Sequence, residues 1–476
     1  MKIKKFLSVA CAALTMLCAA GCGGGGNNTN SGDKLTIMLD SSAFLMGFDE
    51  DIDGAVAEAE RNIANGTTKD TVWNRIVIEN TKLLKTWGQE QEKTIATKNW
   101  GWGDTLTQKL MAAFLAQETP DIINAETQMP GFAEEGYLEP FPADLEAFVR
   151  ENVSPIAYKT MEKNGKIYGI SLTPGITLLF WNKAILRQAN ISNDIIENGP
   201  KDWAEWKQTM AQINSVKDSS GVNLNAGGVY VGSGGVNYGA FFRAGTLMAS
   251  AGGGYADESG APAMNTEANK KAFDFLLEQK NYNLSNILNR AEEGNYFGYF
   301  NTGKMAYKVD GIWGIYEAAE YGLDVGYCLM PTPDGTGDRQ SVLIGACYSG
   351  VPVYAKNKEL AFEAIKFMLS EQVQSNIGKG GQRQPVLKSV LNTVYDQTDA
   401  EWYKPYFADY KYFANYAVEN SVAGLPAFAM KRGKLSSLWG AAGNAMSKTA
   451  AKSNTQTSAQ LLAEAQKTMM AEWNKG

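Results

Sequence analysis

The sequence predicts an α/β protein of two or more lobes, and three observations carry this prediction. Short apolar segments typical of strands alternate with longer segments of helical periodicity, which is the order of α/β units with a largely parallel sheet. About 450 residues follow the N-terminal leader, too many for a single hydrophobic core. No period of roughly 20 to 50 residues repeats along the chain, so a repeat architecture is not expected.

The alternation is clearest in the first part of the chain. Residues 34–39 first alternate between polar and apolar side chains and are then all apolar, a pattern typical of a strand. A polar, acidic segment follows to about Asp70. Residues 71–87 carry apolar side chains at helical spacing. The next expected elements are a strand at 93–97, a helix at 106–116 and a strand at 120–123 that begins with Pro120.

The same alternation continues to the C-terminus. Strands are expected at 166–170, 177–181, 327–330 and 350–354, and helices at 203–213, 238–250, 266–278 and 358–369. Residues 227–239 are rich in glycine, serine and asparagine and are expected to form a loop. The remaining C-terminal part is expected to be helical, with apolar spacing from Leu461 to Trp473.

The first 21 residues have the composition of a secretory signal. Basic residues precede an apolar run at 7–20 that is too short to span a membrane. The run ending Ala19-Ala20-Gly21-Cys22 resembles the lipobox of bacterial lipoproteins, which implies cleavage before Cys22 and a stable acyl anchor on its sulfur. The alternative is an ordinary signal peptide that leaves Cys22 as a free thiol. Residues 22–33 follow as a flexible glycine and asparagine tether.

The composition excludes several functions. Without the leader, 41 Lys and Arg face 51 Asp and Glu, and this acidity argues against a nucleic-acid partner. The chain has no histidine, which removes Ser-His-Asp and Cys-His catalysis and His-ligated zinc. Carboxylate-only chemistry such as glycoside hydrolysis stays open. After the leader, no apolar run approaches the ~20 residues of a spanning helix.

Two cysteines remain beyond the lipobox. Cys328 and Cys347 are an even pair in an extracytoplasmic chain, so they form a disulfide if their strands lie side by side. Two buried free thiols are an equally acceptable arrangement, and the sequence leaves both open.

An acidic stretch matches the spacing of an EF-hand calcium loop. Aspartate occupies loop positions 1, 3 and 5, glycine position 6 and glutamate position 12, a spacing that wraps oxygens around a hard cation. The expected Ca²⁺ ligands are Asp49, Asp51, Asp53, Ala55 and Glu60. The alternative is a solvated acidic turn that leads into a helix over 55–63. No other cofactor is expected.

A series of short motifs carries a family resemblance. Gln117-Glu-Thr-Pro-Asp-Ile122 follows a helix, Gly165-Lys-Ile-Tyr-Gly-Ile170 precedes Leu179-Phe-Trp-Asn-Lys183, and Pro200-Lys-Asp-Trp-Ala-Glu205 opens a helix with Asp202 as a candidate N-cap. Tyr299-Phe-Asn-Thr-Gly-Lys-Met-Ala306 then precedes Asp310-Gly-Ile-Trp313. In this order, over roughly residues 33 to 390, the motifs resemble family 1 extracellular solute-binding proteins of carbohydrate ABC importers, the maltose-binding-protein type. Residues 40–70 look like an insertion in that pattern.

The resemblance implies a type II periplasmic-binding-protein-like fold, with two hinge-linked lobes of mainly parallel sheets. The N-lobe would comprise residues 34–175 and about 350–370, and the C-lobe about 176–345 and 371–476. Chain crossings are expected near 174–177, 345–350 and 369–373. Such a protein is not an enzyme. It is expected to be a monomer on the outer side of the cell membrane, in a Gram-negative or a Gram-positive envelope. It closes on a carbohydrate and delivers it to an ABC permease.

The resemblance also nominates cleft residues, because sugars are held by aromatic planes and by polar groups around their hydroxyls. Trp313 matches the family's cleft tryptophan; the alternative is a core tryptophan beneath a glycine turn. Asp310 is either a sugar-hydroxyl acceptor or a helix cap. The usual Asp-Arg pair after the Pro-Asp strand is absent, and the candidates there are Glu126, Thr127 and Gln128. Trp100 and Trp102 lie on a glycine-flanked loop and either stack on the ligand or pack the loop. The remaining candidates are Tyr230, Asn237, Tyr238, Tyr348 and Arg383.

Two other functions compete with solute binding. The first is a surface-anchored enzyme that processes glycans with carboxylates, although no acid/base pair stands out in the sequence. The second is a glycan-capture lipoprotein that serves an outer-membrane transporter, against which the alternating strands argue.

Overall fold

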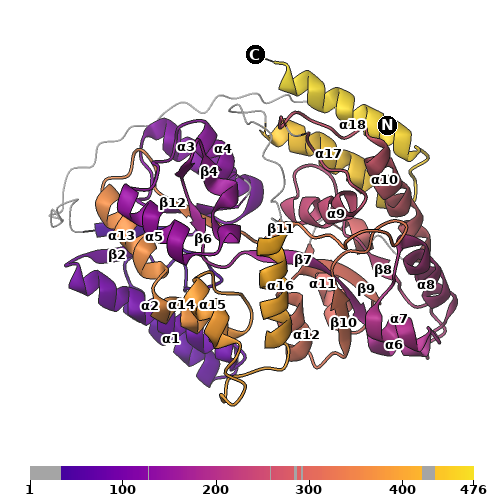
Figure 1. Ribbon diagram of the computed structural model, residues 1–476, viewed down its shortest axis with the longest axis horizontal. Coiled ribbons are helices and arrows are strands. Elements are labelled where there is room, and N and C mark those ends of the chain that lie inside the picture. Colours follow the sequence, from indigo (N-terminus) through magenta and orange to yellow (C-terminus); the bar gives the residue numbers. More distant parts are fainter. Residues whose placement is uncertain are drawn as a thin grey trace, which may run out of the picture.

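The computed structural model of the chain describes residues 34–126, 128–257, 259–283, 287–290, 293–420 and 435–475. They form two lobes with a connecting region between them (Figure 1). Cys22, the 22–33 tether and the leader lie outside the described residues, as does Thr127. Among the helices that are described, none is long and apolar enough to cross a membrane.

The N-lobe is built on short strands flanked by helices. β1 (Lys34–Ile37) pairs in parallel with β2 (Thr94–Thr97), and Ile37 forms a parallel bridge to Ile122. A second sheet has the antiparallel order β3 (Ile123–Ala125), β12 (Tyr348–Gly350), β6 (Ile170–Ser171). The surrounding helices are α1 (Ile52–Ala64), α2 (Val72–Glu90), α3 (Gly103–Ala116), α4 (Met129–Glu134), α5 (Ala143–Asn152) and α13 (Lys358–Met368) (Figure 1).

The C-lobe is organised by one fully buried strand, β7 (Gly175–Asn182). The sheet order is β10 (Val325–Cys328), β7, β9 (Tyr307–Gly311), β8 (Gly227–Gly228), and β11 (Leu343–Ile344) also pairs with β7. Its helices are α6 (Lys183–Gln188), α7 (Asn193–Asn198), α8 (Trp203–Ser215), α9 (Tyr238–Ser250), α10 (Glu267–Gln279), α11 (Glu293–Asn301), α12 (Gly314–Glu320), α17 (Leu435–Ala450) and α18 (Ser458–Trp473). The side chain of Asp202 caps α8 by accepting from the Glu205 amide at 2.7 Å, which confirms that prediction.

The expectation of mainly parallel sheets is wrong for this lobe. β7 pairs antiparallel with β9, β10 and β11, and the β8–β9 pair is the parallel one in this sheet. The expectation rests on the alternation of strands and helices and on the resemblance, whereas strand direction is set by pairing between segments far apart in the chain. The α/β class and the two-lobed arrangement are confirmed.

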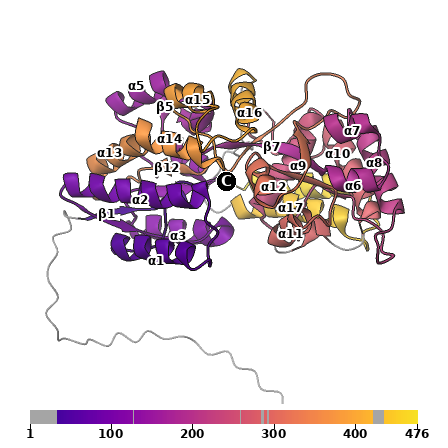
Figure 2. The same ribbon diagram turned by 90° about the horizontal axis from the view of Figure 1, so that it is seen from below.

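The expected boundary at residue 371 is also corrected. α14 (Glu371–Gly380) and α15 (Lys388–Val394) were expected in the C-lobe, but α14 packs along α2 and α13 of the N-lobe and α15 packs on α14. Both views show these helices on the N-lobe side, with α16 (Phe407–Glu419) between the lobes (Figures 1 and 2). The chain therefore leaves the N-lobe for the last time after α15 rather than at 369–373. The other crossings lie between β6 and β7 and between β11 and β12.

Candidate functional site

The two lobes enclose a cleft of about 650 Å³, within the size range of small-molecule sites. The N-lobe contributes the first turn of α3 and the end of β3, and the C-lobe contributes α9, α11 and the segment after β9. Ile344 belongs to β11, next to one chain crossing, and Arg383 lies between α14 and α15 of the N-lobe. The lining residues are Trp102, Gly103, Glu126, Val236, Asn237, Tyr238, Gly239, Phe242, Arg243, Phe297, Trp313, Ile344 and Arg383.

Trp102 is the exposed aromatic side chain of the N-lobe wall. It precedes α3, and its side chain makes no capping hydrogen bond to that helix. Gly101 and Gly103 on either side have φ of +82° and +60°, a backbone conformation that favours glycine. The residue is 51% exposed, so the indole is available to a ligand. Trp100, two residues earlier, packs against the smaller core cluster of the N-lobe and does not line the cleft.

The start of α9 forms part of the C-lobe wall, and Asn237 fixes it. The Asn237 carboxamide oxygen accepts from the Ala240 amide at 2.9 Å, while its nitrogen donates to the Tyr230 hydroxyl at 3.2 Å. Tyr238 lines the cleft one residue later. Tyr230 itself is buried, and its hydroxyl donates to the Arg290 carbonyl at 2.8 Å, so Tyr230 supports this wall and does not face the ligand space.

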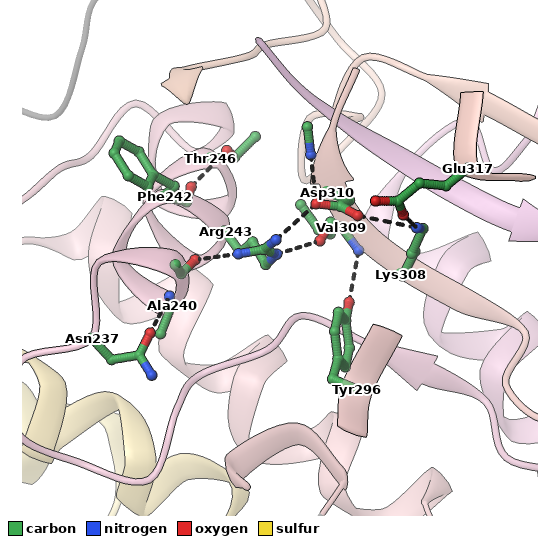
Figure 3. Close-up of polar contacts among 12 residues, drawn as sticks. Asn237, Ala240, Phe242, Arg243, Thr246, Tyr296, Lys308, Val309, Asp310 and Glu317 are labelled. Atoms are coloured by element: carbon green, nitrogen blue, oxygen red, sulfur yellow. Dashed lines mark hydrogen bonds and ion pairs between the residues drawn. The ribbon is translucent and has the colours of Figure 1, made fainter. Parts of the chain in front are cut away.

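A buried ionic network lies beneath the same wall (Figure 3). Arg243 donates to the carbonyls of Val309 and Gly239 at 2.8 Å each and to Asp310 Oδ1 at 2.7 Å. Lys308 Nζ lies 3.0 Å from Asp310 Oδ2 and 3.4 Å from Glu317 Oε2. The network connects α9, β9 and α12. Residues of α9 line the cleft, and Trp313, which also lines it, lies between β9 and α12.

The carboxylates of this network have shifted pKa values. Burial alone raises the pKa of Asp310, but the charges of Lys308 and Arg243 outweigh burial and hold the pKa below its ordinary value. Burial and the neighbouring Asp310 charge raise the pKa of Glu317. Asp310 was expected either to meet sugar hydroxyls or to cap a helix. It does neither, because Arg243 and Lys308 occupy its oxygens and α12 begins after Trp313.

Trp313 lines the cleft, but its ring is largely covered by protein. The guanidinium carbon of Arg383 lies 3.9 Å from the ring centroid, which is face-on contact. A Cβ built on Gly311 would fall almost equally close to three carbons of the benzo ring, so that glycine backbone packs directly against the indole. Trp313 is therefore a rigid part of the wall, partly buried beneath Arg383.

The other sequence-predicted residues divide between the wall and the core. Glu126 lines the cleft just after β3. Gln128 is buried and donates to Thr107 Oγ1 at 2.9 Å, and Tyr348 is buried on β12, so neither lines the cleft. Sequence reasoning missed Phe242, Arg243 and Phe297. The spacing of Tyr238 and Phe242, four positions apart on α9, is the signal that places both on one helical face.

The acidic stretch at 49–60 does not form the expected calcium loop. α1 begins at Ile52, so the later loop positions, including Asp53, Ala55 and Glu60, are helical instead of wrapping around a cation. The carboxylates separate: Asp49 pairs with Lys98, Asp53 with Lys85 and Glu60 with Lys82, while Asp51 caps α1. In the part of the chain that the structure describes, no group of three or more Asp, Glu, Cys or His side chains is placed to hold a metal ion.

Cys328 and Cys347 are both free thiols. Cys328 lies on β10 of the C-lobe sheet, whereas Cys347 is buried between β11 and β12, so their strands are not neighbours. Of the two arrangements that the sequence leaves open, the structure has the separate thiols.

Comparison with known proteins identifies relatives over most of the fold. Residues 82–375 match the family described as bacterial extracellular solute-binding protein. A curated arabinooligosaccharide-binding protein of Bacillus subtilis is 25% identical over 217 residues, which cover 43% of this chain and 45% of that protein. The match thus spans less than half the length of that relative.

Several solved structures share the fold. The GacH receptor of Streptomyces glaucescens, solved unliganded and with acarbose, has a TM-score of 0.65 at 18% identity and covers 93% of this chain and 98% of its own. A solute-binding protein of Thermotoga lettingae bound with α-D-tagatose gives 0.67 at 19%, with 93% and 100% covered. A cyclic α-maltosyl-1,6-maltose binding protein of Arthrobacter globiformis gives 0.66 at 17%, with 93% and 99% covered.

Proposed function

The chain belongs to the bacterial extracellular solute-binding protein family, and on that premise we propose that it captures a sugar or oligosaccharide between its lobes for an ABC importer. The observation that carries this proposal is the cleft itself. Aromatic side chains from both lobes line one space of about 650 Å³: Trp102 from the N-lobe, and Tyr238, Phe242, Phe297 and Trp313 from the C-lobe. Aromatic faces pack against the C–H faces of sugar rings.

The polar groups of the cleft suit the rest of a sugar. Glu126 would accept hydrogen bonds from sugar hydroxyls on the N-lobe side, and Arg383, between α14 and α15, would donate to sugar oxygens. Among the side chains that the structure describes, Glu126 is the one carboxylate that lines the cleft. Glycoside hydrolysis uses a pair of carboxyl groups, so this wall favours binding over the alternative of a glycan-processing enzyme.

Hinge closure supplies the coupling to transport. Within the described residues, three connections join the lobes. A ligand that contacts both walls favours the closed arrangement by its differential affinity for it. A permease then distinguishes loaded protein from empty protein. The lipobox resemblance at Cys22 adds a membrane anchor to this proposal. The protein would thus work as a monomer on the outer side of the membrane.

A thermal-shift screen of the purified chain tests the proposal. The library contains arabino-oligosaccharides, malto-oligosaccharides, tagatose, acarbose and acidic oligosaccharides. Because a ligand that binds the folded state stabilises it by mass action, a cognate sugar at about 100 times its Kd should stabilise the fold by about 2.7 kcal/mol. We expect a dose-dependent rise in melting temperature and no new product by chromatography. Turnover of a library sugar would favour the enzyme instead.

A further inference from the structure

The position of Arg383 indicates what kind of sugar the cleft accepts. Arg383 follows α14, and its guanidinium carbon lies over the Trp313 ring, 3.9 Å from the ring centroid. A Cβ built on Gly345 would meet both the indole, at 2.8 Å, and Arg383 Nη1, at 3.2 Å. The guanidinium is therefore held between the crossing segment and the indole before any ligand arrives. Such pre-organisation lowers the entropy that binding costs.

This guanidinium has unused hydrogen-bonding capacity. Within the described part of the chain, Nε and Nη1 of Arg383 are buried from solvent and have no hydrogen-bond partner. A buried polar group without a partner costs free energy, and the cost is larger for a charged group. The contact with Trp313 offsets part of that cost but satisfies no N–H group. Arg383 itself is partly exposed and lines the cleft, so an anionic group that reaches the guanidinium there would offset more of this cost.

The two arginines that line the cleft, Arg383 and Arg243, differ in how their charges are paired. Arg243 is paired with Asp310 at 2.7 Å, so its charge is balanced inside the protein. The helix N-termini nearest the cleft add a further bias: Gly103 opens α3 and Gly239 lies in the first turn of α9, and both residues line the wall. Helix N-termini carry partial positive charge. Together with Arg383 they favour an anionic group on the ligand.

We propose that the ligand is a carboxylate-bearing sugar of the uronic-acid class, whose carboxylate binds Arg383. This inference rests on the proposed function and names the substrate class of the same cleft. A guanidinium is the side chain best matched to the planar carboxylate, which it binds by charge-assisted hydrogen bonds. A hydroxyl accepts hydrogen bonds but brings no negative charge to the guanidinium, whose other acidic neighbour is the buried Asp40. A dianionic phosphate carries about twice the charge of a carboxylate, so Glu126 in the same cleft repels it more strongly. Glu126 instead accepts ring hydroxyls.

Calorimetry on matched sugar pairs tests the proposal. The pairs are oligogalacturonate against oligogalactose and oligoglucuronate against oligoglucose, each titrated into the wild-type chain and into Arg383→Gln and Arg383→Lys. For the pair that binds, we expect the acidic member to bind at least about 10-fold tighter than the neutral one. Arg383→Gln should weaken the acidic member by about 10- to 100-fold and the neutral one by less than about 3-fold. Arg383→Lys should fall between, because lysine keeps the charge and loses the planar donors.

The outcomes distinguish this inference from the proposed function. If a neutral sugar of the wider library binds and every acidic one binds more weakly, the carboxylate assignment is wrong and sugar capture stands. Equal losses for both members of a pair in Arg383→Gln also overturn it, since Arg383 would then act on the wall rather than on the carboxylate. If no sugar of any kind binds, both proposals fail. Trp313→Phe is a second variant. It keeps an aromatic ring beneath Arg383, so the preference for the acidic sugar of each pair should persist.

Discussion

Nη2 of Arg243 donates to Oδ1 of Asp310 at 2.7 Å beneath the cleft, with both side chains almost completely buried (Figure 3). Lys308 lies 3.0 Å from the other oxygen of the same carboxylate and 3.4 Å from Glu317, so Asp310 is the acid that the two cations share. Breaking such a network from the acidic side leaves buried positive charges uncompensated.

Asp310→Asn should therefore destabilise the protein by about 3–5 kcal/mol, measured by denaturant unfolding followed by tryptophan fluorescence. Asp274→Asn is the matched control, because Asp274 is exposed on α10 and its loss should change stability by less than about 0.5 kcal/mol. Equal stability of the two variants would contradict the importance of the network.

The same network predicts a pH dependence through Glu317. Burial and the Asp310 charge raise the folded-state pKa of Glu317 above its ordinary value of 4.5, while Lys308 and Asn301 oppose the rise. As pH increases from 4.5, the unfolded state loses this proton first, so the contribution of Glu317 to folding stability falls. Melting curves of wild type and Glu317→Gln should therefore diverge with rising pH, with wild type losing stability relative to the variant. A difference that is constant from pH 4 to pH 8 would show that Glu317 titrates normally.

Trp181 on β7 is enclosed by two glycines. Its indole donates to the Ile196 carbonyl at 2.8 Å, and Cβ atoms built on Gly199 and Gly326 would collide with the ring. Gly326→Ala should destabilise the C-lobe by about 1–3 kcal/mol, because the buried tryptophan has no room to shift. Gly440→Ala on α17 meets no atom within 4 Å and should be neutral or stabilising by about 1 kcal/mol. Thermal unfolding of the two variants decides; a Gly326→Ala protein as stable as wild type counts against the packing described here.

The anchor proposed at Cys22 has its own test. Cells that express the chain and grow with radioactive palmitate should label it, and Cys22→Ala should abolish the label. Cys328→Ala is the control, because Cys328 lies within the folded C-lobe on β10 and should keep full labelling. Label that persists in Cys22→Ala would show that the lipid is attached elsewhere or that the lipobox is not used.

The sequence predicts local elements better than it predicts contacts between distant segments. Asp202 caps its helix because capping depends on residues three apart in the chain. The direction of β7 depends on pairing with strands more than 100 residues away, which periodicity does not reveal. The calcium motif failed for a related reason. Spacing alone indicates a loop, whereas helix formation from Ile52 turns the same carboxylates toward different lysines.

The cleft shows the same division. Trp102 and Trp313 are recognisable from glycine-flanked motifs, and both line the cleft. The sequence does not show that Arg383, 70 residues after Trp313, lies over the indole, or that Asp310 forms an ion pair with Arg243. Tertiary packing decides which partners a buried polar side chain has. A polar residue next to a cleft motif can therefore support the cleft wall instead of contacting the ligand.

The central claim is that a sugar binds between the lobes, and Trp102 tests it most directly. Its indole is the half-exposed aromatic of the N-lobe wall, so its removal alters the cleft with little effect on the core. Calorimetric titration of the cognate sugar into Trp102→Ala should show affinity reduced by about 10-fold or more. Tyr321→Ala, an exposed aromatic that does not line the cleft, should bind as wild type does. Undiminished affinity in Trp102→Ala would contradict sugar binding at this cleft.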